Sequence, residues 1–479
     1  MSEQALAPRI VNLLSKDRYF AVLIVTLSFC IGITGIVLNG MQFSPDSTGF
    51  HNYAVNLVAG RGYTSDLSSE PQTKLNREPG YPVFLGVVYR VYANLGEISY
   101  IQQGDYDLEE KRLLSNYPEI WAVKYFQALL MALGVLLFYK SLLPFFAPRT
   151  CKLSALILSI FYPYQVFSSF LLRESLIAFF TVLLGYLLCR YYSTRKGIFM
   201  LGAAAVLALG SLTWQAYMAF TPLVPIMLWF ASKDFAKLIK YSALSGIVYI
   251  VLIFPWLWFS YSKAADIKIV KSMGTTYTHE LMNYVAAMDK AVFHKLITAK
   301  EKRELEDEWY YDLSSKEVVE NSFTGIYTRK ADSLNAELKR RGKSELKYLM
   351  VSSSQRLANM FFQTHWYPHS LPKGIGSLLR SYRNEGFIYT LFGLGMVSIS
   401  LFIALFSLTG LGLMPAGKQL ALLPFWGFLV FFYPIGSVSR RFMPVIPWMI
   451  LLSVFAVTRM FQRSLQPKLT QNNQKEVQS

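Results

Sequence analysis

The sequence predicts an all-α integral membrane protein with about ten transmembrane helices, and three observations support this fold class. Apolar residues make up 53% of the 479 positions, charged residues make up only 16%, and the mean hydropathy is +0.31. A soluble domain of ordinary composition has about 25% charged residues. The apolar residues are gathered in blocks of about the 20 residues that a helix needs to cross roughly 30 Å of hydrocarbon. Lysine and arginine residues flank alternate connections between these blocks.

The first apolar block covers residues 19–40. It is longer than the core of a signal peptide, and no small-x-small cleavage site follows it. We therefore expect it to be an uncleaved signal anchor, which is the first span.

Nine further blocks follow. The stretch 154–188 must hold two helices, because a single helix of that length would reach roughly 52 Å. Pro163 and the charged pair Arg173–Glu174 mark the expected break. The ten predicted spans are 19–40, 120–143, 153–170, 174–192, 197–213, 216–232, 241–260, 387–409, 419–436 and 441–459.

The net charge of +17 is assigned to cytoplasmic flanks that face anionic lipid, rather than to nucleic-acid binding. With the N-terminus inside, every short inner segment is basic. The residues concerned are Arg9, Lys16, Arg18, Arg149, Lys152, Arg190, Arg195, Lys196, Lys233, Lys237, Lys240, Lys418, Arg459, Arg463, Lys468 and Lys475. This places both termini in the cytoplasm and predicts a multi-pass membrane protein.

Four regions follow from this topology. Residues 1–260 form an N-terminal transmembrane catalytic module, which includes an outer loop at 41–119 with interfacial helices near 50–59 and 81–95. A large and mostly helical outer loop covers residues 261–386, C-terminal transmembrane helices cover 387–465, and 466–479 form a disordered cytoplasmic tail.

Asp46 is the first candidate catalytic residue. It follows the first span by a few residues, so its carboxylate lies at the outer membrane surface, within reach of a lipid phosphate and a polar acceptor. A helix N-cap for a segment that starts near Thr48 is an equally good interpretation of the same position.

Arg77 and Glu78 begin the segment Arg-Glu-Pro-Gly-Tyr-Pro, in which the prolines and the glycine predict a turn before a helix. The planar guanidinium of Arg77 suits a phosphate, and Glu78 suits acid–base chemistry or the holding of an acceptor. An ordinary loop-to-helix junction remains the alternative.

Two charged pairs lie beside apolar spans. Arg173–Glu174 interrupts an apolar run, where charges cost several kcal/mol unless they lie at the surface or in a polar cavity. Arg440–Arg441 precedes the last span on the outer side, where inner-side charge rules predict no cations. We expect such charges to be functional, and the guanidiniums of Arg440 and Arg441 suit a lipid phosphate or pyrophosphate. Mutual pairing of Arg173 with Glu174, and headgroup anchoring by Arg440–Arg441, are the alternatives.

His51, Tyr53 and Tyr81 are candidate acceptor or sugar contacts, because they lie close to Asp46 and Arg77 in the sequence. His365 and His369 have the i, i+4 spacing of a metal pair, but Pro368 breaks the helix and no zinc motif follows. The sequence therefore predicts no metal site and no certain cofactor, and it leaves divalent-metal use open.

The order of these motifs resembles that of the C-type membrane glycosyltransferases that use polyprenyl-phosphate sugars. The group meant is that of the bacterial relatives of dolichyl-phosphate-mannose protein mannosyltransferases and of the aminoarabinose transferase that acts on lipid A. Residues 46–63 resemble its outer-loop pattern of Asp, Tyr, Ala, Leu and Gly-x-Gly, and residues 77–85 resemble its Arg-x-Pro-Gly-Tyr-Pro-x-Phe-Leu segment. Glu174 and the Arg-Phe-Met-Pro sequence at 441–444 also fit.

The sequence departs from this pattern in three places. Ser47 stands where protein mannosyltransferases usually have Glu, the Arg-Asn that often follows Pro255–Trp256 is absent, and residues 261–350 have no counterpart. These differences concern the sugar and the acceptor more than the class of reaction.

The resemblance implies a C-type glycosyltransferase fold and a sugar transfer on the outer face of the bacterial cytoplasmic (inner) membrane. It makes Glu78 and Glu174 further candidate catalytic residues, and Arg173 and Arg440 further candidates for binding the donor phosphate. It implies a polyprenyl-phosphate sugar donor, a glycan, lipid or protein acceptor, surrounding membrane lipids and no nucleic acid. Asp46 would act as a general base or orient the acceptor, while Arg77 and Arg441 would stabilise the departing phosphate.

Two other classes stay open. A lipid-linked oligosaccharide flippase would place charges along an inner cavity, whereas most candidate charges here gather on the outer rim. A glycan polymerase or ligase with a lipid-pyrophosphate donor would favour arginines in large outer loops, and the basic loop 261–386 is compatible with it.

Overall fold

The computed structural model describes most of the chain. The described residues are 17–42, 45–66, 77–92, 98–101, 116–264, 336–342, 387–432 and 443–478, together with 68, 73, 75, 105–107, 112–114 and 333. Nearly all of the large outer loop 261–386 therefore lies outside the described residues, as do Arg440, Arg441, His365 and His369.

The described part of the chain is helical, apart from one antiparallel ladder in which β1 (Tyr106–Asp107) pairs with β2 (Arg112–Leu113). In chain order, the helices before residue 265 are α2 (Asp17–Asn39), α3 (Pro45–Val58), α4 (Gly80–Tyr92), α5 (Pro118–Leu142), α6 (Pro148–Ile160), α7 (Tyr162–Gln165), the 3₁₀-helix η2 (Val166–Ser169), α8 (Glu174–Thr194), α9 (Ile198–Thr213), the 3₁₀-helix η3 (Gln215–Phe220), α10 (Leu223–Ser232) and α11 (Phe235–Ala264). The C-terminal part contains α19 (Phe387–Leu413), the 3₁₀-helix η5 (Ala416–Leu422), α20 (Leu423–Phe432) and α21 (Ile446–Gln478).

Five of the described helices are long and apolar enough to cross a bilayer, which confirms a multi-pass membrane protein. The spanning segments are Asp17–Asn39, Pro118–Leu142, Glu174–Thr194, Phe235–Lys263 and Met443–Gln462, and Ile198–Thr213 and Leu401–Leu413 are shorter apolar helices. The total of about ten spans remains a prediction.

Three of the predicted spans are broken rather than continuous. The segment predicted as 153–170 consists of α6, α7 and η2, because the backbone is extended at Phe161 and Pro163 follows. The segment predicted as 216–232 begins with η3 and becomes α-helical only after Pro222. The segment predicted as 419–436 begins as η5 before α20.

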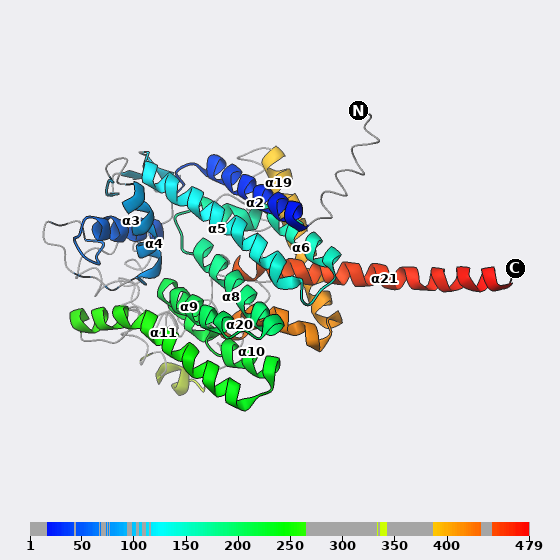
Figure 1. Cartoon of the computed structure of the whole chain (residues 1–479). Helices are drawn as coiled ribbons and strands as arrows, with labels where there is room; N and C mark the ends of the chain where they lie inside the picture. The colour runs from blue at the N-terminus through cyan, green and yellow to red at the C-terminus, as the bar shows by residue number, and fades with distance from the viewer. Residues whose placement is uncertain are drawn as a thin grey trace.

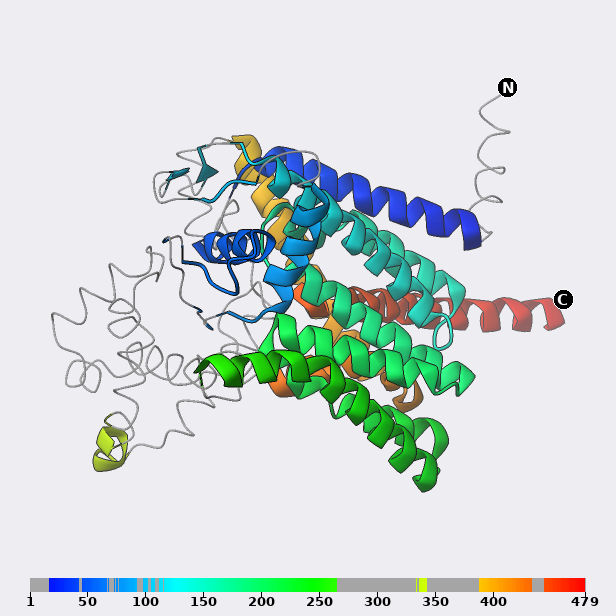
Figure 2. The same ribbon diagram turned by 60° about the vertical axis from the view of Figure 1, so that its left-hand side comes forward.

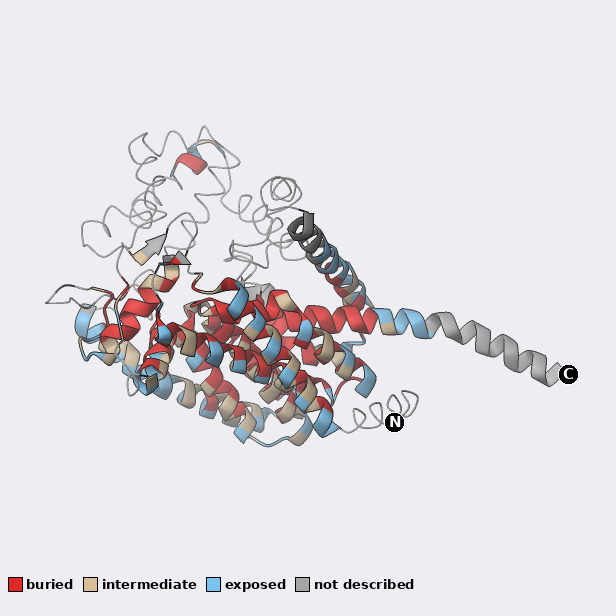
Figure 3. Ribbon diagram, turned by 90° about the horizontal axis from the view of Figure 1, so that it is seen from above, coloured by how far each residue is buried: buried red, intermediate tan, exposed pale blue. Residues whose placement is uncertain are grey.

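The helices form a bundle in which α5 and α8 are central (Figure 1). α5 packs against α2 and α8, α8 packs against α9, α9 packs against α11, and α21 packs against α19. Figure 3 shows that the first turns of α21, up to Ala456, are buried within the bundle. By contrast, Ile250 and Val251 of α11 are 61% and 62% exposed. Such an apolar outer surface is typical of a helix that faces lipid.

α3 and α4 lie at one end of the bundle, and the start of α2 and the end of α21 lie at the other end (Figure 2). α3 and α4 confirm that the first outer loop contains two helices, although α3 begins earlier than the sequence indicates. Asp46 therefore lies in the first helical turn, with its negative charge at the positive end of the helix dipole. α21 continues as a helix to Gln478. The expectation of a disordered tail after Gln466 stays a prediction.

The packing of α4 against α9 depends on Gly80. A Cβ atom at this position would lie 2.7 Å from the backbone nitrogen of Thr213 and 2.8 Å from the carbonyl carbon of Leu212. No real Cβ atom tolerates such contacts with backbone, so only glycine fits at the start of α4.

We expect Gly80→Ala to destabilise the protein by about 1–3 kcal/mol, because overpacking forces α4 away from α9. The measurement is thermal unfolding in detergent. Gly86→Ala is the matched control on the same helix, since its Cβ would meet its nearest atom at 3.8 Å, an ordinary contact. An equal effect of both substitutions would contradict this account of the junction.

Candidate active site

Asp46 and Arg77 form an ion pair at the end of the bundle where α3 and α4 lie. The Arg77 guanidinium donates to Asp46 Oδ1 at 2.8 Å, and it also lies 5.2 Å from the centre of the Phe50 ring. The side chains of Arg77 and Asp46 are 34% and 29% exposed. Both charges are thus held in place and remain accessible to a ligand.

Burial lowers the pKa of Arg77, but the charge and hydrogen bond of Asp46 outweigh it and raise the pKa above its ordinary value. Arg77 is therefore a permanent cation at this site.

Glu78, the next residue, forms a second ion pair in the opposite direction. Its Oε2 accepts a 2.6 Å hydrogen bond from Arg173, and its Oε1 accepts one of 3.4 Å from the backbone N–H of Gln215. Arg173 also lies 5.7 Å from the centre of the Trp214 ring. The Glu78 and Arg173 side chains are 7% and 19% exposed, so this inner pair is less accessible than the outer pair.

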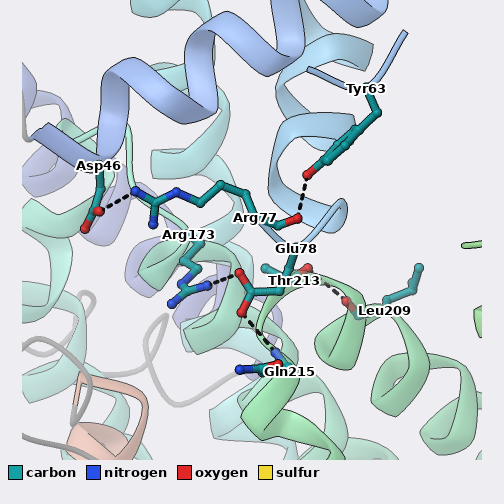
Figure 4. A network of polar contacts seen from close by, with 8 residues as sticks. All are labelled: Asp46, Tyr63, Arg77, Glu78, Arg173, Leu209, Thr213 and Gln215. Carbon is teal, nitrogen blue, oxygen red and sulfur yellow. Dashed lines mark hydrogen bonds and ion pairs between the residues drawn. The ribbon is translucent and has the colours of Figure 1, made fainter. Parts of the chain in front are cut away.

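The four charged groups alternate in sign from Asp46 through Arg77 and Glu78 to Arg173, as Figure 4 shows. Because Arg77 and Glu78 are adjacent, one short backbone segment connects α3, the start of α8 and the junction between α9 and η3. We call these four residues the charge array.

Tyr63 fixes the backbone of this segment. Its hydroxyl donates to the Arg77 carbonyl at 2.9 Å, and its ring packs against Tyr53 at 4.5 Å and against Trp256 of α11 at 4.7 Å. Burial raises the pKa of Tyr63 well above its ordinary value, so the hydroxyl stays protonated and keeps this hydrogen bond. Pro255–Trp256 thus contacts the candidate site through Tyr63.

The structure places the three predicted sugar contacts in the interior. His51 and Tyr81 are completely buried, and Tyr53 is 2% exposed. Tyr81 donates to Gln127, while the two ring nitrogens of His51 contact the Tyr89 hydroxyl and the Ser99 carbonyl.

Since the Ser99 carbonyl can only accept, the Nε2 atom of His51 carries the proton and Nδ1 accepts from Tyr89. These contacts correct the prediction for His51 and Tyr81: their polar atoms hold the first outer loop together and present no surface to a sugar.

Glu174 is also buried, at 7% exposure, in the first turn of α8 directly after Arg173. It lies at the same end of the bundle as the charge array, but the structure brings Arg173, and not Glu174, into contact with Glu78. The predicted partners Arg440 and Arg441 lie outside the described residues.

The described residues contain no group of three or more His, Cys, Asp or Glu side chains that could hold a metal ion. The carboxylate of Asp46 is instead neutralised by Arg77.

Sequence reasoning missed two partners at this site. Gln215 binds Glu78 through its backbone, and Gln127 holds Tyr81 while donating to the carbonyls of Ser168 and Phe170. A polar residue in an apolar block was the available signal for both.

Comparison with known proteins agrees with this architecture. Residues 85–271 match the family model described as dolichyl-phosphate-mannose-protein mannosyltransferase, a range that includes Arg173 and Glu174 but not Asp46. The oligosaccharyltransferase of Archaeoglobus fulgidus tethered with an acceptor peptide is similar in structure, with a TM-score of 0.51 and 12% identity over 94% of this chain and 50% of that one. This chain has the fold of the C-type membrane glycosyltransferases, and part of it is similar to the protein mannosyltransferase family.

Two further solved structures are similar to this chain. The same archaeal enzyme, AglB, in complex with an inhibitory peptide and a dolichol-phosphate gives a TM-score of 0.50 at 12% identity, over 95% of this chain and 52% of that one. ArnT from Cupriavidus metallidurans bound to undecaprenyl phosphate gives 0.39 at 14% identity, over 94% and 80%. The chain thus spans about half the length of the archaeal enzymes. No curated protein sequence matches it.

The inner ion pair, between Glu78 and Arg173, can be tested by a double-mutant cycle. We expect Arg173→Met or Glu78→Gln alone to reduce the free energy of unfolding by about 3 kcal/mol, because each leaves a buried charge without its partner. The double variant should lose much less than the sum. The measurement is unfolding by denaturant in detergent, and strictly additive losses would contradict the pairing.

Burial also makes His51 a source of pH dependence, because it lowers the pKa of this residue to about 4 from an ordinary 6.5. Between these values the unfolded chain binds the proton and the folded chain does not, so stability falls as the pH falls from 6.5 to 4. The shift corresponds to about 3 kcal/mol.

The measurement compares the melting temperature of the wild type with that of His51→Gln across this pH range. The variant should lose this part of the pH slope, whatever its absolute stability. The same slope in both proteins would contradict the buried neutral state of His51.

Proposed function

We propose that the protein transfers a sugar from a polyprenyl-phosphate donor to a hydroxyl group of a glycan, lipid or protein acceptor. The observation that carries this proposal is the accessible Asp46–Arg77 pair at the end of the bundle. It puts a carboxylate beside a permanent cation, which are the two charges that the reaction requires. The family match supports a donor linked to a lipid phosphate.

The proposed reaction is a single displacement. The acceptor oxygen bonds to the anomeric carbon while the bond between that carbon and the phosphate oxygen breaks, which inverts the configuration. Asp46 accepts the proton of the acceptor hydroxyl, and the bonding electrons leave with the lipid phosphate. Arg77 stabilises the negative charge that develops on that phosphate.

The exposed fractions support a division of roles between the two ion pairs. Asp46 and Arg77 are about a third exposed and would contact the substrates. Glu78 and Arg173 are largely buried and would hold Asp46 and Arg77 in position. This assigns Glu78 and Arg173 to positioning rather than to catalysis and phosphate binding. Glu174, Arg440 and Arg441 stay candidates for acceptor and donor contacts.

We further propose that the site faces the outside of the bacterial inner membrane, with both termini in the cytoplasm. The support is the position of α3 and α4, where the charge array lies, at the end of the bundle opposite the start of α2 and the end of α21 (Figure 2), together with the basic short segments at that second end.

The test offers radiolabelled polyprenyl-phosphate sugars and membrane extract to the purified protein. We expect Asp46→Asn to reduce transfer about 10²–10⁴-fold, because the general base is lost, and Arg77→Gln to reduce it about 10²-fold or more. Asp17→Asn is the matched control, since Asp17 forms an ion pair with Lys152 at the opposite end of the bundle. Full transfer by Asp46→Asn would contradict the catalytic role of Asp46.

The same experiment separates the remaining classes. Transfer only from a pyrophosphate-linked donor would identify a polymerase or ligase. The absence of transfer from any donor, with lipid movement in reconstituted vesicles, would identify a flippase.

A further inference from the structure

Gln215 stands out among the polar residues beside the charge array. Its side-chain Oε1 atom is buried and has no hydrogen-bond partner, while its backbone N–H is held by Glu78. A buried acceptor without a donor costs about 1–3 kcal/mol. Such a cost at a candidate active site is explained if a ligand provides the missing donor.

The backbone around Gln215 is irregular in a way that points the residue at the site. α9 ends at Thr213, Trp214 is extended with φ −150° and ψ 109°, and η3 then begins at Gln215. Irregular backbone in a membrane bundle is tolerated where it is buried in protein or lines a polar cavity. Here the break places Gln215 against the carboxylate that also binds Arg173.

Figure 4 shows the Gln215 side chain extending below Glu78, on the side of that carboxylate where the Arg173 guanidinium lies. Glu78 Oε1 is 3.4 Å from the Gln215 nitrogen and Glu78 Oε2 is 2.6 Å from Arg173. The backbone of Gln215 is therefore held at the inner end of the charge array, and the acceptor atom of its side chain is unused.

The geometry points to Gln215 as a residue that binds the sugar of the donor, with Oε1 accepting a hydrogen bond from a sugar hydroxyl. This inference rests on the proposed function, and it identifies which part of the donor the inner end of the site holds. Arg77 recognises the phosphate, which every polyprenyl-phosphate donor shares. An amide oxygen accepts a hydrogen bond from a hydroxyl group, and within the donor lipid it is the sugar that carries hydroxyl groups.

The decisive comparison uses two lipids that differ by the sugar alone. Purified full-length protein in nanodiscs is titrated with polyprenyl phosphate, and then with polyprenyl-phosphate mannose or glucose, for the wild type and Gln215→Leu. We expect the variant to bind polyprenyl phosphate as the wild type does and to bind the sugar-bearing lipid about 3- to 10-fold more weakly, as for one hydrogen bond.

The melting temperature of the protein without ligand separates this assignment from a structural role. Because Oε1 has no partner, Gln215→Leu should leave the melting temperature unchanged or raise it, since the variant removes a buried polar atom that no group satisfies. A structural role of the side-chain amide predicts a lower melting temperature instead. A matched control is Ser154→Ala on α6, which removes another buried polar atom without a partner, a hydroxyl, and should change neither lipid affinity.

Equal weakening for both lipids, or no weakening for either, would overturn the assignment and leave an ordered water as the partner of Oε1. Equal affinity of the wild type for the two lipids would overturn it as well. The proposed function is judged separately, by sugar transfer in the wild type. If the wild type transfers sugar and Gln215→Leu binds both lipids as the wild type does, only the assignment of Gln215 is refuted.

Discussion

The adjacent charges of Arg77 and Glu78 are the constraint on which the rest of the site depends. Two successive side chains of opposite charge extend to different elements, one to Asp46 of α3 and the other to Arg173 at the start of α8. Neither pair can form unless the outer loop returns to the bundle at one particular place. The loop and the membrane helices are thereby joined through four charges whose sum is zero.

The surrounding packing serves the same junction. Gly80 admits α4 against the end of α9, and Tyr63 holds the Arg77 carbonyl while packing on Trp256 of α11. The outer pair stays accessible and the inner pair is covered, so the site combines a rigid base with an open rim. Preorganised charges of this kind are how an enzyme stabilises developing charge without reorganising during the reaction.

The fold class could be predicted from the sequence because long apolar blocks permit few alternatives in a membrane. Helix breaks were harder. Pro163 and Pro222 mark two of them, but the extended residue Trp214 carries no sequence signal and depends on contacts between distant segments.

The candidate site was predictable in its members and not in their pairing. The sequence singled out Asp46, Arg77, Glu78 and Arg173 as chemical residues, yet it treated Arg173–Glu174 as the pair. The structure pairs Arg173 with Glu78, 95 positions away. His51 and Tyr81 were singled out for their proximity in sequence, whereas burial assigns their polar atoms to neighbouring protein groups. Periodicity gives no information on such long-range contacts.

An experimental structure with bound polyprenyl phosphate tests the central claim most directly. The account predicts that the lipid phosphate lies within hydrogen-bonding distance of the Arg77 guanidinium while Glu78 and Arg173 remain paired. A phosphate bound to Arg173, with the contact between Glu78 and Arg173 broken and Arg77 still held by Asp46 alone, would contradict it.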